Sequence, residues 1–240
     1  MIFVKKIPSS KDELASRIDH TLLKPDAPLS KYIEEWKKAS MYGFRAFVAP
    51  LTIIEMLQEG GSFELPPVRL ATVIGFPNGY TTVESKLAEI KRAAEVGVSD
   101  VDFVPNLVMV KSGLWEHVDY EINKIIKEAK NSGLVTKIIL ETGYLAKDEL
   151  NKLASIAIKR GVDYLKTSTG FGPRGATVDD IIALREISGR KAGIKASGGI
   201  RTAIQAALFI GLGADIIGTS SGVSIVEGFS SEIVSLFKSS

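Results

Sequence analysis

Two lysines in apolar surroundings are the residues of this sequence best suited to chemistry. Lys166 ends the run VDYLK and Lys195 lies inside the run GIKAS, and both runs are typical of buried strands. A buried ammonium ion is costly without a partner or a role. Desolvation and a second cation nearby both lower the pKa of a lysine, which yields the neutral amine that attacks a carbonyl group to form a Schiff base. We therefore interpret the two lysines as candidates for imine chemistry.

A purely structural role is the alternative interpretation of each lysine. Either amine could pair with a carboxylate such as Asp102 or Glu141, or extend along apolar surface to reach solvent. Two lysines on neighbouring strands with an aspartate nearby favour chemistry more than a single lysine does. The spacing alone does not tell which of the two lysines would be the nucleophile.

Residues 170–175, GFGPRG, match the Gly-x-Gly-x-x-Gly pattern of a dinucleotide-binding turn. Such turns need an acidic residue about 20 positions later to hold the ribose. The sequence has no acidic residue between Glu186 and Asp215, and Pro173 lies inside the pattern. The next helix is expected to begin only near Thr177. We interpret the segment as a flexible loop over a site, and we expect no cofactor.

Composition and charge restrict the class of protein. The 240 residues are 45% hydrophobic and 24% charged, with 30 basic and 28 acidic side chains and a formal net charge of +2, as in soluble globular proteins. The chain has no basic block that favours nucleic acid and no run of about 18 apolar residues, and we expect no signal peptide because residues 1–8 lack a long apolar core. We expect a cytoplasmic protein with no membrane partner. The lack of cysteine and the presence of only His20 and His117 argue against disulfides and multi-histidine metal sites.

Eight short apolar runs alternate with amphipathic segments along the chain. The runs are too continuously apolar for a sheet with one solvent-facing side, and they suit parallel strands covered by helices. This alternation predicts an α/β fold, a single-domain (β/α)8 TIM barrel over residues 1–240 with a short N-terminal helix, and an open doubly wound sheet is the alternative. The expected strands are Ile18–Thr21, Phe44–Ala49, Arg69–Ile74, Val101–Val104, Leu134–Leu140, Val162–Leu165, Ile194–Ala196 and Asp215–Gly218.

Glycines and hydroxyl side chains follow the last two expected strands, at the end where the active sites of such barrels lie. Backbone N–H groups, hydroxyls and a helix start at this place are typical of phosphate sites. The first expected strand also contributes polar side chains to the same end. The residues concerned are Asp19, Thr21, Gly198, Gly199, Arg201, Gly218, Ser220 and Ser221.

Seven segments, which together span nearly the whole chain in order, carry a resemblance to a known family. They are IDHTLLKPDA (18–27), VIGFPNG (73–79), DVDFV (100–104), KIILET (137–142), LKTSTGFGPRGAT (165–177), GIKASGGIRT (193–202) and GADIIGTSSGV (213–223). With these segments the sequence resembles the deoxyribose-phosphate aldolase family in its class I, Schiff-base form. The resemblance implies reversible cleavage of 2-deoxy-D-ribose 5-phosphate to D-glyceraldehyde 3-phosphate and acetaldehyde.

The resemblance also implies roles for individual residues. Lys166 would be the Schiff-base lysine, Lys195 the second lysine that tunes its pKa, and Asp102 the proton-relay aspartate. The implied partners are a phosphosugar and aldehydes, no metal or nucleic acid, and further copies of the chain in a dimer or tetramer. Another class I aldolase or transaldolase-like enzyme on a different phosphosugar, or a non-catalytic phosphosugar-binding barrel, is the alternative. The positions matched to phosphate binding and to the polar first strand are Gly170, Gly198, Gly199, Gly218, Ser220, Ser221, Asp19 and Thr21.

Several positions depart from the family pattern. Residues 47–49, Phe-Val-Ala, replace a Cys-Val-Asn run found in many members, and Gly143 replaces a cysteine that often follows the Glu-Thr of the fifth strand. Pro105 replaces an aliphatic residue, and the C-terminal SLFKSS carries no tyrosine. We expect Phe47 and Gly143 at the mouth of the site, which would then lack the thiol that other members place there.

Overall fold

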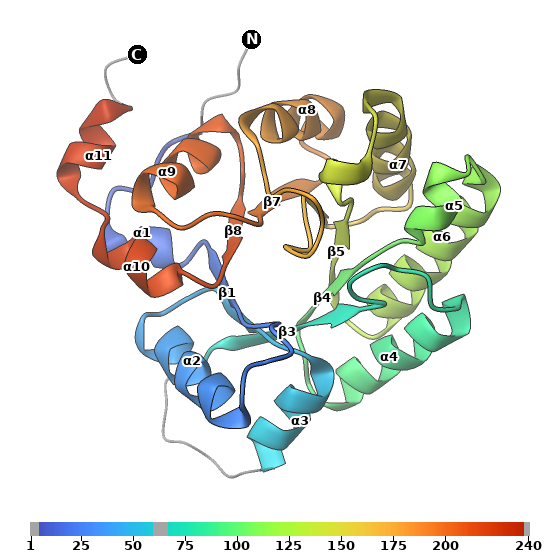
Figure 1. Cartoon of the computed structure of the whole chain (residues 1–240), viewed down its shortest axis with the longest axis horizontal. Helices are drawn as coiled ribbons and strands as arrows, with labels where there is room; N and C mark the ends of the chain where they lie inside the picture. Colours follow the sequence, from blue (N-terminus) through green and yellow to red (C-terminus); the bar gives the residue numbers. More distant parts are fainter. Residues whose placement is uncertain (1–4, 60–66, 238–240) are drawn as a thin grey trace.

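Eight parallel strands close into one barrel in the order of the chain, and β8 pairs with β1 (Figure 1). The computed structural model describes residues 5–59 and 67–237. The closed barrel confirms the predicted TIM barrel and excludes the open sheet. The strands are β1 (Ile18–Thr21), β2 (Ala46–Val48), β3 (Arg69–Ile74), β4 (Asp100–Phe103), β5 (Val135–Ile139), β6 (Tyr164–Lys166), β7 (Gly193–Ser197) and β8 (Ile216–Thr219).

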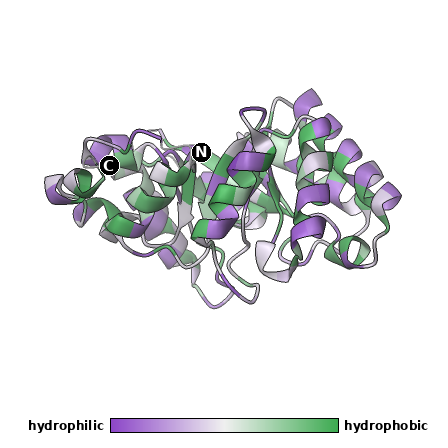
Figure 2. Ribbon diagram, turned by 90° about the horizontal axis from the view of Figure 1, so that it is seen from above, coloured by the Kyte–Doolittle hydropathy of each residue, from purple (hydrophilic) through white to green (hydrophobic). Residues whose placement is uncertain are grey.

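Helices surround the barrel, and the short N-terminal helix is present as α1. In Figure 2 the same helices carry hydrophobic and hydrophilic residues, as expected for helices with one face on the sheet and one in solvent. Within the described residues, no helix is long and apolar enough to cross a membrane. The helices are α1 (Lys11–Ala15), α2 (Leu29–Met41), α3 (Leu51–Glu59), α4 (Val83–Glu95), α5 (Leu107–Lys111), α6 (Trp115–Asn131), the 3-10 helix η1 (Thr142–Tyr144), α7 (Lys147–Lys159), α8 (Val178–Ser188), α9 (Ala203–Leu212), α10 (Gly222–Glu227) and α11 (Ser231–Leu236).

The strands separate an apolar outer layer from an interior that is partly charged. Successive side chains on a strand point to opposite faces, so alternate residues enter the barrel. On β2 and β3 the interior residues are small and apolar, and Ala46, Val48 and Ala71 pack together there. On the other side of the barrel, the register aligns Lys166 with Lys195. Two cations on neighbouring strands therefore face the same interior space.

The expected position of Phe47 at the mouth of the site is wrong. Because Ala46 and Val48 point into the barrel, Phe47 points outward, and it is completely buried in the core between the strands and the helices. Its ring centroid lies 6.5 Å from that of His20, its register partner on β1. Gly143 lies in η1, where an added Cβ atom would be 3.0 Å from Cγ of Pro173, so this position faces the loop between β6 and α8.

Candidate active site

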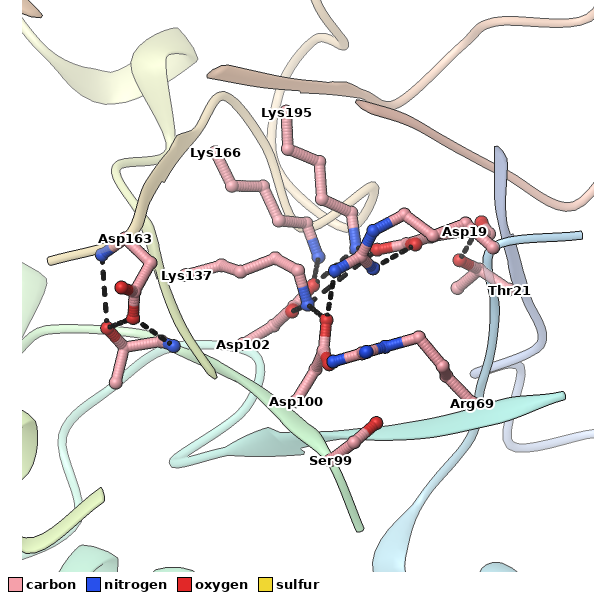
Figure 3. A network of polar contacts seen from close by, with 12 residues as sticks. Asp19, Thr21, Arg69, Ser99, Asp100, Asp102, Lys137, Asp163, Lys166 and Lys195 are labelled. Atoms are coloured by element: carbon pink, nitrogen blue, oxygen red, sulfur yellow. Dashed lines mark hydrogen bonds and ion pairs between the residues drawn. The ribbon is translucent and has the colours of Figure 1, made fainter. Parts of the chain in front are cut away.

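The interior of the barrel holds a network of charged side chains around Asp102 (Figure 3). Its Oδ2 atom accepts hydrogen bonds from Nζ of Lys166 at 2.8 Å and from Nζ of Lys195 at 2.7 Å. Its Oδ1 atom accepts one from Nζ of Lys137 at 2.9 Å. Lysines from the three consecutive strands β5, β6 and β7 thus meet at one carboxylate, and the three residues implied by the family resemblance lie together.

Two further aspartates complete the network. Nζ of Lys195 donates to Asp19 at 2.6 Å, and Nζ of Lys137 lies 2.7 Å from a carboxylate oxygen of Asp100. The guanidinium of Arg45 bridges these two aspartates, with distances of 2.7 Å to Asp19 and 2.6 Å to Asp100. Each carboxylate of the network therefore has at least two cationic partners.

The sequence analysis did not identify Lys137, Arg45 or Asp100 as members of this network. Lys137 lies in an apolar strand, within the KIILET segment, and carries the same signal that identified Lys166. It is completely buried and paired with two carboxylates at hydrogen-bond distance. Its surroundings suit a fixed cation that holds Asp102 in place.

The surroundings shift the pKa values of Lys166 and Lys137 in opposite directions. Burial lowers the pKa of Lys166 to about 8, with Asp102 opposing the change and the Lys195 cation adding to it. Burial also acts against the charge on Lys137, but Asp102, Asp19 and Asp100 outweigh it and raise the pKa of that lysine. Lys166 therefore loses its proton at a lower pH than an ordinary lysine does.

Burial acts against the charge of Asp102 as well. The cations Lys137, Lys166 and Lys195 outweigh that effect and hold the pKa of Asp102 well below its ordinary value. Asp102 is therefore an ionised acceptor in the unliganded network. A proton released at Nζ of Lys166 has this carboxylate as its neighbour.

A cavity of about 290 Å³ opens over Lys166 at the carboxyl ends of the strands. The cavity is not lined by Lys137, Lys195, Asp102 or Asp19, which are all buried. The predicted site residues that line it are Thr21, Lys166, Gly170, Gly198, Gly199, Arg201, Gly218 and Ser220. Within the described part of the chain, Lys166 is therefore the only lysine of the network that a ligand in this cavity can reach.

The structure specifies how the expected phosphate site is built. Just before α9, the side chain of Gln205 accepts hydrogen bonds from the backbone N–H groups of Arg201 and Thr202. Ser221, also predicted, does not line the cavity, and its N–H donates to the hydroxyl of Thr219. These three N–H groups are therefore already bonded within the protein.

Other groups around the cavity remain suited to an anion. The side chain of Arg201 lies at its rim, and Lys24, which the sequence analysis did not identify, lies there as well. Gly198 and Gly199 have φ angles of 88° and 74°, so their backbone turns in a conformation that glycine adopts without strain. At Gly218 a side chain is excluded by lack of space, since an added Cβ atom would lie 2.8 Å from Cε of Lys195. That glycine gives the second lysine its space.

No group of three or more His, Cys, Asp or Glu side chains within residues 5–59 and 67–237 is arranged to hold a metal ion. In the network, lysine and arginine side chains lie opposite aspartate.

Comparison with known protein families shows to which family the chain belongs. The description "DeoC/LacD family aldolase" belongs to a family whose pattern matches residues 18–228. The chain is a member of this aldolase family. The match runs from the first residue of β1 into the segment after α10 and so includes all eight strands of the barrel.

Individual relatives agree with the family. A deoxyribose-phosphate aldolase of Caldanaerobacter subterraneus subsp. tengcongensis is 41% identical over 215 residues, which are 89% of this chain and 92% of the relative. The enzyme of the same name from Thermococcus gammatolerans is 42% identical over 216 residues, 90% of this chain and 96% of the relative. A tetrameric deoxyribose phosphate aldolase structure from Aeropyrum pernix matches with a TM-score of 0.83 and 38% identity, covering 94% of each chain.

Proposed function

We propose that this member of the aldolase family reversibly cleaves 2-deoxy-D-ribose 5-phosphate to D-glyceraldehyde 3-phosphate and acetaldehyde, through a Schiff base on Lys166. One observation carries the proposal. Lys166 combines a pKa lowered to about 8 with a place in the wall of the cavity. The names of the relatives support the choice of substrate, and the closed barrel brings the proposed site residues together.

The chemistry begins with neutral Lys166, whose Nζ attacks C1 of the open-chain sugar. Asp102, 2.8 Å from that nitrogen, accepts the proton that the addition frees and passes it to the former carbonyl oxygen, which becomes a hydroxyl. One further proton, taken up from solvent, lets this hydroxyl leave as water, and an iminium ion remains. The iminium ion takes the electron pair of the C2–C3 bond while the C3 hydroxyl loses its proton. D-glyceraldehyde 3-phosphate leaves, the remaining enamine is protonated at C2, and water hydrolyses the imine to release acetaldehyde.

The neighbours of Lys166 have distinct parts in this scheme. Lys195 lies between Asp19 and Asp102, at 2.6 and 2.7 Å, and its positive charge disfavours a proton on Lys166. Arg201, Lys24 and the turn at Gly198 bind the phosphate at the rim of the cavity. Binding energy from the phosphate, which takes no part in the bond change, holds the sugar in its reacting geometry.

Two measurements test this proposal. The first compares turnover of 2-deoxyribose 5-phosphate with turnover of fructose 1,6-bisphosphate, and we expect activity with the former. The second treats the protein with substrate and borohydride and locates the reduced adduct by peptide mapping, with Lys166→Ala as the control that should neither trap nor turn over substrate. Faster turnover of fructose 1,6-bisphosphate would show that the proposed substrate is wrong. Failure to trap an adduct would favour a non-catalytic phosphosugar-binding barrel.

We also propose that the chain forms a homo-oligomer, a dimer or a tetramer. The tetrameric Aeropyrum pernix relative, at 38% identity, supports this proposal. Light scattering after size-exclusion chromatography tests it, and a mass near 25.9 kDa, that of one chain, would contradict it.

A further inference from the structure

Glu141 has an unusual backbone conformation directly after β5. Its φ and ψ angles are 52° and 61°, in the left-handed region, and it is the one residue other than glycine with a positive φ in the part of the chain that the structure describes. Side chains with a Cβ atom disfavour this region, and such residues persist only where surrounding contacts hold them. The contacts of Glu141 therefore indicate what this position does.

The carboxylate of Glu141 binds the start of the loop between β6 and α8. Glu141 is 1% exposed, and its Oε2 atom accepts hydrogen bonds from the backbone N–H of Thr169 at 3.0 Å and from the hydroxyl of Thr169. The same hydroxyl accepts a hydrogen bond from the N–H of Phe171 at 3.0 Å. One carboxylate oxygen thus orders three consecutive loop residues.

The loop lies directly against this carboxyl group. A Cβ atom added to Gly172 would be 2.6 Å from Cδ of Glu141, so the second glycine of the Gly-x-Gly pattern permits the contact. Further along the loop, Arg174 donates to the backbone oxygen of Thr142 at 3.2 Å and pairs with Asp180 of α8. The segment after β5 therefore holds both ends of the loop.

The part of the loop that Glu141 orders is also a wall of the active site. Thr169, Gly170 and Phe171 line the same cavity as Lys166. Glu141 itself does not line the cavity, and its carboxylate accepts its hydrogen bonds from Thr169 rather than from the lysines around Asp102. Its effect on a ligand must pass through the loop.

We propose that Glu141 is a positioning residue, whose buried carboxylate holds Thr169 to Gly172 in the shape that encloses the phosphosugar. The inference rests on the proposed aldolase function and adds a residue to it. Because acetaldehyde is much smaller than the phosphosugar, imine formation between Lys166 and acetaldehyde does not need the loop wall. Binding of 2-deoxyribose 5-phosphate does.

Three variants separate the carboxylate from the backbone. Glu141→Gly adopts a positive φ without strain and removes only the side chain. Thr169→Val removes the hydroxyl that links Glu141 to Phe171. Thr142→Val is the matched control, since it removes a neighbouring buried hydroxyl that has no hydrogen-bond partner among the described residues.

Kinetics should then distinguish positioning from general damage. We expect Glu141→Gly to lower kcat/KM for 2-deoxyribose 5-phosphate by roughly 10- to 100-fold, mainly through KM, as for the loss of charge-assisted hydrogen bonds. Borohydride trapping of acetaldehyde on Lys166 should stay within about twofold of wild type. Adding Thr169→Val to Glu141→Gly should cost little more, because both act on one contact. Thr142→Val should behave as wild type.

Amide hydrogen exchange gives a readout that needs no activity. The N–H of Phe171 should exchange faster in Glu141→Gly than in wild type, while the strands keep their protection. Wild-type KM and unchanged exchange in Glu141→Gly would overturn the inference, as would fully additive effects of the two substitutions. Absence of turnover in the wild type would instead refute the proposed function, and the exchange measurement would still decide the role of Glu141.

Discussion

Substitutions of Lys195 and Asp102 should move the pKa of Lys166 in opposite directions. Lys195→Met removes a cation that disfavours the proton on Lys166, so the pKa of Lys166 should rise above about 8. Asp102→Asn removes the carboxylate that favours this proton, so the pKa should fall below that value. Burial is the largest cause of the shift and remains in both variants.

The size of each effect follows from the fraction of neutral amine. With a pKa of about 8, roughly one Lys166 side chain in ten is neutral at pH 7, which is roughly 300 times the fraction for an ordinary lysine of pKa 10.5. A full return of Lys166 to the ordinary lysine pKa would slow imine formation at pH 7 by roughly 300-fold. Because burial persists in Lys195→Met, we expect this variant to slow imine formation by less than that. Asp102→Asn can raise the neutral fraction by roughly tenfold at most.

The two variants should also differ in turnover. Asp102→Asn should lose roughly 10² to 10⁴ in kcat from slower proton transfer, although its amine is more often neutral. The rate of borohydride trapping with acetaldehyde, measured from pH 6 to pH 10, gives the midpoint of the Lys166 titration in each variant. If both midpoints move in the same direction, or neither moves, the assignment of charges around Lys166 is wrong.

Three further outcomes follow from the site. Arg201→Ala should raise KM for 2-deoxyribose 5-phosphate by roughly tenfold without changing that for 2-deoxyribose, since a charge-assisted contact to phosphate is lost. Lys137→Met should lower the free energy of unfolding, measured in urea, by about 3 kcal/mol, because a buried ion pair loses its cation, and an unchanged midpoint would contradict its assigned role. The chain has no cysteine, so we expect slower inactivation by crotonaldehyde than in a Phe171→Cys variant with a thiol in the cavity wall; equal rates would show that thiols are not the target.

The sequence predicts every strand of the barrel but not every boundary. Apolar runs extend beyond the strands where flanking residues remain buried, as at Phe44 and Ala49 on either side of β2. The opposite error occurs at β4, which begins at Asp100 rather than at Val101. A charged residue does not belong to an apolar run, and its burial depends on Arg45 and other partners distant in sequence.

The residues of the candidate site likewise include some that the sequence predicts and some that it does not. Lys166 and Lys195 can be predicted because an unpaired charge in an apolar strand is conspicuous in any sequence. Lys137 carries that signal too, but its role depends on two carboxylates of β4, which are distant in sequence. Glu141 cannot be predicted, because a left-handed residue other than glycine reflects tertiary contacts and not its own preference. The position of Phe47 cannot be predicted either, because the direction of its side chain depends on which residues of β2 point into the barrel.

The composition of the network supports the proposal that Lys166, and not Lys195 or Lys137, is the amine that reacts. Five cations, three lysines and two arginines, share the three carboxylates Asp19, Asp100 and Asp102. Lys195 has two carboxylate partners, whereas Lys166 has one, Asp102, which it shares with two other lysines. Loss of the proton from Lys166, the lysine with the fewest carboxylate partners, relieves part of this excess of positive charge. Lys166 also lines the cavity, so in the proposed reaction the same arrangement favours the neutral amine and places it where a carbonyl group can reach it.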